Sequence, residues 1–206
     1  IKFSENFIPA NYRNSFKSCF PKEFMSEAAE FLDRQNNEIK SLVTAVSLAY
    51  WNATISGKQE DYGDYERKTL AVQKYFHNRE NFEKVRELLN IAEDEIEKRQ
   101  LELLYNDYLS CQGDEKLLEE ITKIATRIEQ RFNTFRANLD GKDVTDNDIK
   151  KILKEETNSE KLRQAWESSK KQGEVVEKEL IELIKLRNRL AKSLGFDNYH
   201  VMSLEL

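Results

Sequence analysis

The chain has 206 residues, of which 39% are hydrophobic, 10% aromatic and 34% charged, and its formal net charge is -5 with a pI near 5.4. This length allows one large domain or two small ones, and the aromatic content argues against an intrinsically disordered chain. The acidic balance argues against a nucleic-acid partner, which needs a basic face, and no apolar run is long enough to span a bilayer.

Residues that break helices are few. The chain has six glycines and two prolines, Pro9 and Pro21, and both prolines lie near its start. We therefore predict an irregular arm over residues 1–21 and a single helical region over residues 22–206. Because Glu, Lys, Leu and Ala are abundant in that region, the predicted fold class is all-α, a bundle of long helices.

The first helix is predicted from residue 22 to about residue 55, where apolar residues recur at the three-four spacing of one helix face. Gly57 and Gly63 are then predicted to bracket a loop, and Asp64 is predicted to cap the helix that follows.

The middle of the chain is predicted to contain three further helices. A break at residues 77–79 precedes one helix, and the acidic residues 93–95 are suited to the first turn of another, which runs to about Cys111. A turn at 113–114 then leads into the clearest apolar stripe of the chain, over residues 117–135.

A tight turn at residues 139–142 predicts a short hairpin near 139–144. Thr145, with Asp148 three residues later, is predicted to cap a short helix. The pattern Thr157-x-x-Glu160 predicts a capping box for the helix that holds Trp166.

Glycines are predicted to divide the last part of the chain. Gly173 is predicted to end or bend the Trp166 helix, and Gly195 is predicted to stop the long helix that follows, with Phe196 packing back onto it. Asn198 and its neighbour Asp197 are candidates to cap a last helix.

Zinc chemistry of the peptidase kind requires His-Glu-x-x-His on a helix, and this chain does not carry that motif. Its two histidines, His77 and His200, are not followed by Glu. His77-x-x-Glu80 offers two ligands on one helical face, which is too few for a zinc site. We therefore predict no metal ligands and no catalytic residues in this chain.

The sequence also gives little support for a catalytic cysteine or for a calcium-binding loop. Cys19 lies between two lysines in FKSCFPKEF, but no histidine is near in the sequence, so both Cys19 and Cys111 are interpreted as free thiols. The segment that begins at Asp143 lacks glycine at the sixth position of a calcium loop and has Lys154 at the twelfth, so it does not fit an EF-hand.

The stretch AWESSKKQG, followed by a helix ending in LRNRLAKSLGFDNY, resembles the zinc peptidases of the angiotensin-converting-enzyme type. The residues that carry the resemblance are Ala165, Trp166, Glu167, Gly173, Asn188, Ala191, Gly195 and Phe196. Upstream, AYWNATIS places Trp51 and Asn52 where the first helix of this family ends. The thimet and oligoendopeptidase-type peptidases are a second choice.

This resemblance implies the N-terminal helical part of a two-lobed, all-helical shell around a peptide channel. Helices in residues 22–92 would form a lid, helices in residues 93–206 would form channel walls, and zinc would be bound by a C-terminal catalytic region after the matched segment. Many relatives bind chloride through an arginine where this chain has Lys170. Lysine keeps the charge but lacks the planar fork, so Lys170 is a candidate anion ligand and chloride dependence is left open.

Each residue singled out also has a structural interpretation. Trp51 and Trp166 are candidate core anchors, Gly195 is explained by a helix end, and Lys170 by a solvated surface. The leading interpretation is a non-zinc-binding region of a peptidyl-dipeptidase or carboxypeptidase-like enzyme that acts on small peptides; the alternative is a non-catalytic helical scaffold or binding module. If the chain is a fragment, self-association through the Trp166 helix and the long helix ending at Leu194 is expected.

Overall fold

The computed structural model describes residues 25–206, and in this part of the chain it consists of eight α-helices and one two-stranded hairpin. The arm predicted for residues 1–21, with Pro9, Pro21 and Cys19, lies outside the described residues. The elements are α1 (Glu27–Ser56), α2 (Gln59–Phe76), α3 (Arg79–Ile91), α4 (Glu95–Ser110), α5 (Glu115–Thr134), β1 (Ala137–Leu139), β2 (Lys142–Val144), α6 (Asp146–Glu155), α7 (Ser159–Ser193) and α8 (Tyr199–Glu205). The predicted all-α fold class and the hairpin are confirmed.

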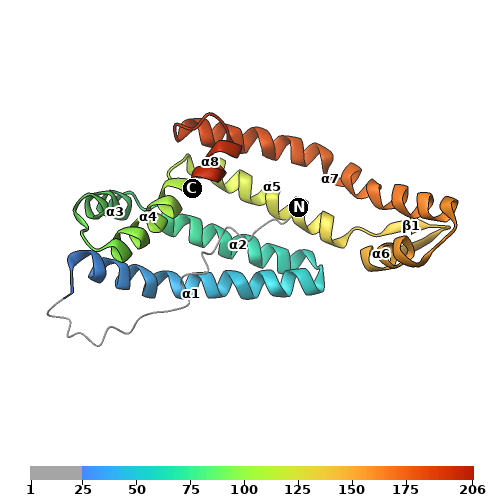
Figure 1. The fold of residues 1–206 in the computed structure, drawn as a ribbon, viewed down its shortest axis with the longest axis horizontal. Coiled ribbons are helices and arrows are strands. Elements are labelled where there is room, and N and C mark those ends of the chain that lie inside the picture. The colour runs from blue at the N-terminus through green and yellow to red at the C-terminus, as the bar shows by residue number, and fades with distance from the viewer. Residues whose placement is uncertain (1–24) are drawn as a thin grey trace.

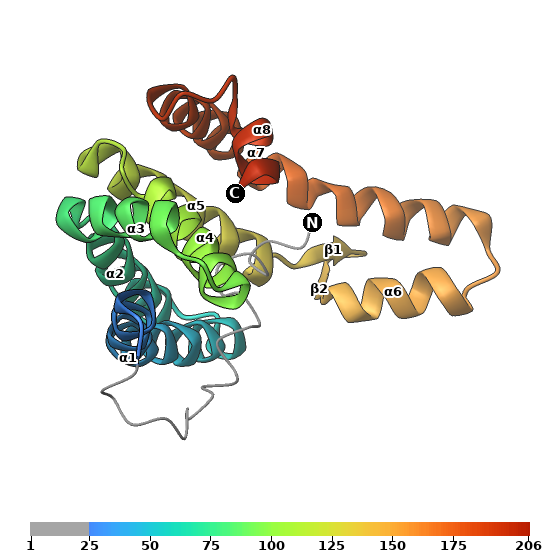
Figure 2. The same cartoon turned by 60° about the vertical axis from the view of Figure 1, so that its left-hand side comes forward.

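The four longest helices lie side by side in the order α1, α2, α5, α7 (Figure 1). The shorter pair α3 and α4 packs across one end of α1 and α2, and α8 lies beside the last turns of α7. The hairpin, α6 and the first half of α7 extend away from the α1–α4 bundle (Figure 2). No helix within residues 25–206 is both long enough and apolar enough to cross a membrane.

The buried apolar residues form three clusters. The first joins α1, α2, α3 and α4 and includes Phe31, Phe76, Val85, Leu101 and Tyr108. The second lies between α5 and α7 and includes Leu118, Ile121, Ile128, Leu183 and Leu190. The third, built from Ala137, Ile149 and Ala165, fixes the hairpin and α6 against α7. These clusters supply the hydrophobic stabilisation that holds the helices in layers.

Side chains at the helix starts satisfy backbone donors that have no partner inside the helix. The side chains of Ser26, Asn78, Asp94 and Asp114 accept hydrogen bonds from backbone N–H groups of α1, α3, α4 and α5. The predicted break near residue 78 and the predicted turn at 113–114 are therefore confirmed. The predicted start of a helix at the acidic residues 93–95 is also confirmed, because α4 begins directly after Asp94.

The loop predicted between Gly57 and Gly63 is wrong at its second boundary. α1 does end at Gly57, whose φ of 68° lies in the left-handed region. However, α2 begins at Gln59 and contains both Gly63 and Asp64. Instead of capping a helix, the Asp64 carboxylate pairs within α2 with Arg67 at 2.9 Å and Lys68 at 2.7 Å. Such pairs at (i, i+3) and (i, i+4) support a helix interior.

The hairpin and the start of α6 follow the prediction. Asn138 is opposite Asp143 in an antiparallel ladder, and the two turn residues, Asp140 and Gly141, have φ values of 52° and 78°. Positive φ at both positions is what a two-residue hairpin turn requires. Thr145 and Asp148 then form a reciprocal capping box at the start of α6.

The long helix α7 begins one residue later than predicted and runs without interruption from Ser159 to Ser193. Asn158, not Thr157, is the N-cap, because its Oδ1 accepts from the backbone N–H groups of Glu160 and Lys161 at 3.0 and 3.1 Å. The backbone N–H of Thr157 donates to the Glu156 carboxylate at 2.8 Å. The predicted capping box at Thr157 and Glu160 is therefore wrong.

Gly173 does not end a helix, because α7 continues through it. Glycine costs about 1 kcal/mol relative to alanine inside a helix. Burial of Val176, Leu183 and Leu190 against α5 outweighs that cost. The predicted stop at Gly195 is confirmed: its φ is 93°, and the backbone N–H of Phe196 donates to the carbonyl of Ala191 at 3.0 Å.

Candidate functional site

The residue pair Trp166 and Lys170 lies on an exposed face of α7. The Lys170 Nζ is 5.2 Å from the centroid of the Trp166 ring, and the indole is 53% exposed. The spacing of four residues on a helix brings the two side chains together, and an ammonium over an indole face is favourable. Lys170 is therefore accessible to an anion, with the ring as its neighbour.

Glu167 takes part in surface ion pairs. Its carboxylate accepts from Arg163 at 2.8 Å, and Arg163 also pairs with Glu160 at 2.6 Å. These hydrogen bonds raise the pKa of the Arg163 guanidinium and lower the pKa of the Glu160 carboxyl. Exposed pairs of this kind contribute little to stability, so they orient the side chains rather than hold the fold.

A shallow hollow of about 220 Å³ lies between α7 and the hairpin and is lined by Asn138, Asp140, Glu167, Ser168 and Lys171, among others. The Ser168 hydroxyl donates to the carbonyl of Asn138 at 2.7 Å and fixes the hairpin to the helix. The hollow is open and carries charges of both signs, so it lacks the apolar enclosure typical of a small-molecule site.

Asn188 connects α7 to α8. Its Oδ1 accepts from the backbone N–H of Tyr199 at 2.9 Å, and the guanidinium of Arg187 lies 4.9 Å from the centroid of the Tyr199 ring. Together with the helix stop at Gly195, these contacts turn the chain back onto α7. The structure thus gives Asn188 and Gly195 structural roles.

Trp51 and Asn52 lie near the end of α1, and both side chains are exposed. Trp51 is 65% exposed and forms a stripe with Leu48 and Ile55 on the outer side of α1. The interpretation of Trp51 and Trp166 as core anchors is therefore wrong for both. They are also not brought together, because α2 and α5 separate α1 from α7 (Figure 1).

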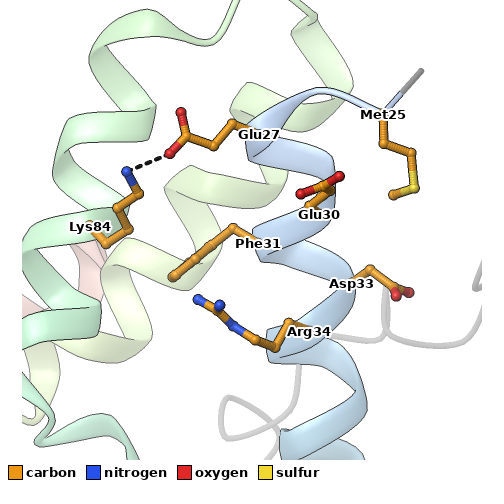
Figure 3. A pocket seen from close by; sticks show the side chains of 7 residues that line it. All are labelled: Met25, Glu27, Glu30, Phe31, Asp33, Arg34 and Lys84. Carbon is orange, nitrogen blue, oxygen red and sulfur yellow. Dashed lines mark ion pairs between the residues drawn. The ribbon is translucent and has the colours of Figure 1, made fainter. Parts of the chain in front are cut away.

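A second hollow, with a volume of about 550 Å³, lies at the start of α1, beside α3 (Figure 3). Lys84 pairs with Glu27 at 2.6 Å at one side of it. The guanidinium of Arg34 lies 5.1 Å from the centroid of the Phe31 ring. Three carboxylates, of Glu27, Glu30 and Asp33, also line this hollow, so its lining is predominantly charged.

The histidines do not form a metal centre with their neighbours. His77 ends α2 and Glu80 belongs to α3, so the expected pair on one helical face does not exist. The His77 Nδ1 instead donates to the carbonyl of Cys111 at 2.6 Å. Within residues 25–206, no three His, Cys, Asp or Glu side chains are close enough to hold a metal ion. The described residues therefore do not fit a zinc ion.

Cys111 is not an activated nucleophile. Its side chain is buried, and burial raises the pKa of the thiol to about 11. A thiol with that pKa carries almost no thiolate near neutral pH, whereas the thiolate is the reactive form.

A group of polar side chains meets between α1, α2 and α4 around the buried Gln35, and it was not predicted from the sequence. Gln35 is only 1% exposed, and its Oε1 accepts from the hydroxyls of Tyr75 at 2.8 Å and Tyr108 at 2.6 Å. One signal was present: Gln35 lies four residues from Phe31 and from Ile39, within the apolar stripe of α1. A polar residue at such a position needs partners that are distant in the sequence.

Comparison with known proteins identifies the class and then the family. A family model described as angiotensin-converting enzyme, peptidase family M2, matches residues 22–205. The class that this match defines is that of the zinc metallopeptidases. The chain belongs to this family, and the match is to part of the family's domain. The family uses zinc and acts on peptide substrates. Among curated proteins, no significant match to the chain was found.

Proposed function

We propose that this chain is the N-terminal, non-zinc-binding helical region of a peptidyl-dipeptidase or carboxypeptidase-like enzyme that hydrolyses small peptides. The observation that carries the proposal is the family match, which extends over nearly all of the described helices. The finding that the matched region is all-helical and layered also supports it.

In this proposal, the helices up to residue 92 form a lid and those from residue 93 onward form walls of a peptide channel. The zinc ligands come from a C-terminal catalytic region that this sequence does not include, since neither His77 nor His200 is followed by Glu. Zinc would polarise the scissile carbonyl and activate water there. The residues of this chain supply shape and charge, and Lys170 is its candidate anion ligand.

A non-catalytic helical scaffold is the second candidate. It is favoured by the buried clusters, which this chain completes with its own residues: Leu88, Leu101 and Leu183 are fully buried. A chain that buries its own core does not need a catalytic region in order to fold.

The reading frame beyond the codon for Leu206 distinguishes the two candidates. We expect it to encode His-Glu-x-x-His and a later helical Glu, and the longest product to release amino acids or dipeptides from short synthetic peptides. Chelation of zinc should abolish that release, and exchange of the motif Glu for Gln should abolish it while zinc stays bound. A frame without the motif, or a product that binds no zinc and cleaves no peptide, would favour the scaffold.

A further inference from the structure

The packing of α2 on α5 is the main helix contact between the α1–α4 bundle and the rest of the described chain (Figure 1). Val72 and Phe76 of α2 belong to the first buried cluster, whereas Leu118 and Ile121 of α5 belong to the second. Within residues 25–206 these two clusters are separate, so no common apolar core joins α2 to α5. An interface of this kind leaves the units on its two sides free to open from each other.

Polar side chains connect α5 to α1 and α2, and we call them the polar seam. They are Tyr50 of α1, Tyr62 and Gln73 of α2, and Thr122, Glu129 and Asn133 of α5. The Thr122 hydroxyl donates to Gln73 Oε1 at 3.0 Å, and the side-chain amide of Asn133 donates to the Tyr62 hydroxyl at 3.1 Å. Such hydrogen bonds replace bonds that the same groups make to water in an open form, so their net contribution to holding the surfaces together is modest.

Glu129 supplies the carboxyl group of the polar seam. Its side chain is half-buried, and burial raises the pKa of its carboxyl although the Tyr50 hydroxyl donates a hydrogen bond to it. Tyr62 and Tyr65 of α2 are its neighbours, because burial and, to a smaller extent, the charge of Glu129 raise the pKa of both phenols. The ring centroids of Tyr50 and Tyr65 are 5.2 Å apart. Glu129 thus lies among three tyrosines where α1, α2 and α5 meet.

Basic side chains do not compensate the charge of Glu129. Among residues 25–206, no lysine, arginine or histidine contributes to the pKa of its carboxyl. The flanking basic residues of α5, Arg127 and Arg131, are directed towards α7 instead, where both pair with Glu179 at 3.2 Å. A carboxylate in a half-buried position without a cation is less stable than its protonated form. The ionised Glu129 therefore destabilises the contact that the protonated Glu129 supports.

We propose that the polar seam is a pH-sensitive latch between the α1–α4 bundle and α5, and that the latch loosens when Glu129 loses its proton. Below about pH 4 the carboxyl is protonated in both the closed and the open form. As pH rises, the open form, in which water surrounds Glu129, releases the proton first, so opening becomes more favourable. The bundle includes the helices assigned above to a lid, but this proposal does not rest on the peptidase function.

Amide hydrogen exchange of the 206-residue chain at pH 5 and at pH 8, corrected for the intrinsic exchange rates, measures this opening. Peptides of α2 and α5 should be protected about threefold less, or weaker still, at pH 8 than at pH 5. Glu129→Gln keeps an acceptor for the Tyr50 hydroxyl but cannot ionise, so it should remove the difference between the two pH values. Tyr50→Phe removes a hydrogen bond that favours the charged form, so it should enlarge the difference.

Two control variants separate Glu129 from other carboxyl groups. Glu120 lies on the same helix but on its α7 side, 3.8 Å from the Arg189 guanidinium, and Asp107 is a half-buried carboxyl of α4. Glu120→Gln and Asp107→Asn should therefore leave the pH response of α2 and α5 unchanged, and far-UV circular dichroism shows that each variant is folded. Equal protection of the wild-type chain at both pH values would overturn the proposal. So would a pH response that persists in Glu129→Gln, or one that disappears in Glu120→Gln or Asp107→Asn.

Discussion

At the scale of single residues, the polar groups that lie wholly or partly inside this protein are more informative than its exposed charges. Burial raises the pKa of the Asp107 carboxyl to about 7 and also raises the pKa of the Glu129 carboxyl. Gln35 accepts two tyrosine hydroxyls in the first core cluster. By contrast, ion pairs such as Arg163–Glu160 lie in solvent and contribute little.

The half-buried Asp107 should make the stability of the protein fall as pH rises. Below about pH 4 the carboxyl is protonated in both the folded and the unfolded chain. Between about pH 4 and 7 only the unfolded chain releases the proton, so the free energy of unfolding decreases with rising pH. Asp107→Asn removes the ionisation, and we expect it to raise the free energy of unfolding by about 1 to 3 kcal/mol at pH 8.

Urea unfolding at pH 4 and at pH 8 checks this prediction. The stabilisation by Asp107→Asn should be present at pH 8 and absent at pH 4. Asp197→Asn, at an exposed carboxylate, is the control and should change neither value. Equal effects of Asp107→Asn at both pH values would show that its carboxyl is not the source of the pH dependence.

At the scale of elements, the starts of the helices depend on local hydrogen bonds, whereas their lengths depend on packing. Asn158 starts α7 through two backbone hydrogen bonds. The same helix then continues for 35 residues through a glycine because its apolar face is buried against α5 and the hairpin.

The N-cap of α7 can be tested by two neighbouring alanine substitutions. Asn158→Ala removes the acceptor for two N–H groups and should cost about 1 kcal/mol of stability. Thr157→Ala, at the position expected from sequence to be the cap, should change stability by less than about 0.5 kcal/mol. Chemical denaturation of both variants gives the comparison, and a larger cost for Thr157→Ala would place the helix start at the sequence-predicted residue.

Gly173→Ala tests whether the glycine inside α7 is required by contacts within its own chain. An added methyl group has free space, so we expect the variant to be more stable by about 0.5 to 1 kcal/mol. Thermal unfolding at low protein concentration measures this effect on the monomer. A loss of stability would mean that the position has a constraint within its own chain.

At the scale of the whole molecule, the chain is a layered helical structure with its own buried clusters and an exposed apolar stripe on α1. The family to which it belongs uses zinc. The described residues bring no three potential ligands together, and His77 is engaged with the carbonyl of Cys111.

We therefore expect the purified 206-residue chain to hold no stoichiometric zinc after dialysis and to leave peptides uncleaved. His77→Ala should not alter its zinc content, as measured by atomic emission. One tightly held zinc ion per chain that disappears in His77→Ala would instead identify this histidine as a ligand.

The sequence by itself determined the fold class, most helix boundaries and the family. Helix periodicity, the turn at Asp140–Gly141 and the stop at Gly195 depend on residues close together in the chain, and local chemistry decides such features. The AWESSKKQG stretch and the later LRNRLAKSLGFDNY carried a resemblance that the family match confirmed.

Only the tertiary structure decided what each side chain contacts. It showed that Trp51 and Trp166 are exposed, that Gln35 is buried among tyrosines and that Gly173 lies within one continuous helix. It also showed that α2 begins before Gly63 and that Asn158 is the cap of α7. These outcomes depend on which helix faces meet, and contacts between residues distant in the sequence, such as Gln35 and Tyr108, are fixed only when the helices pack.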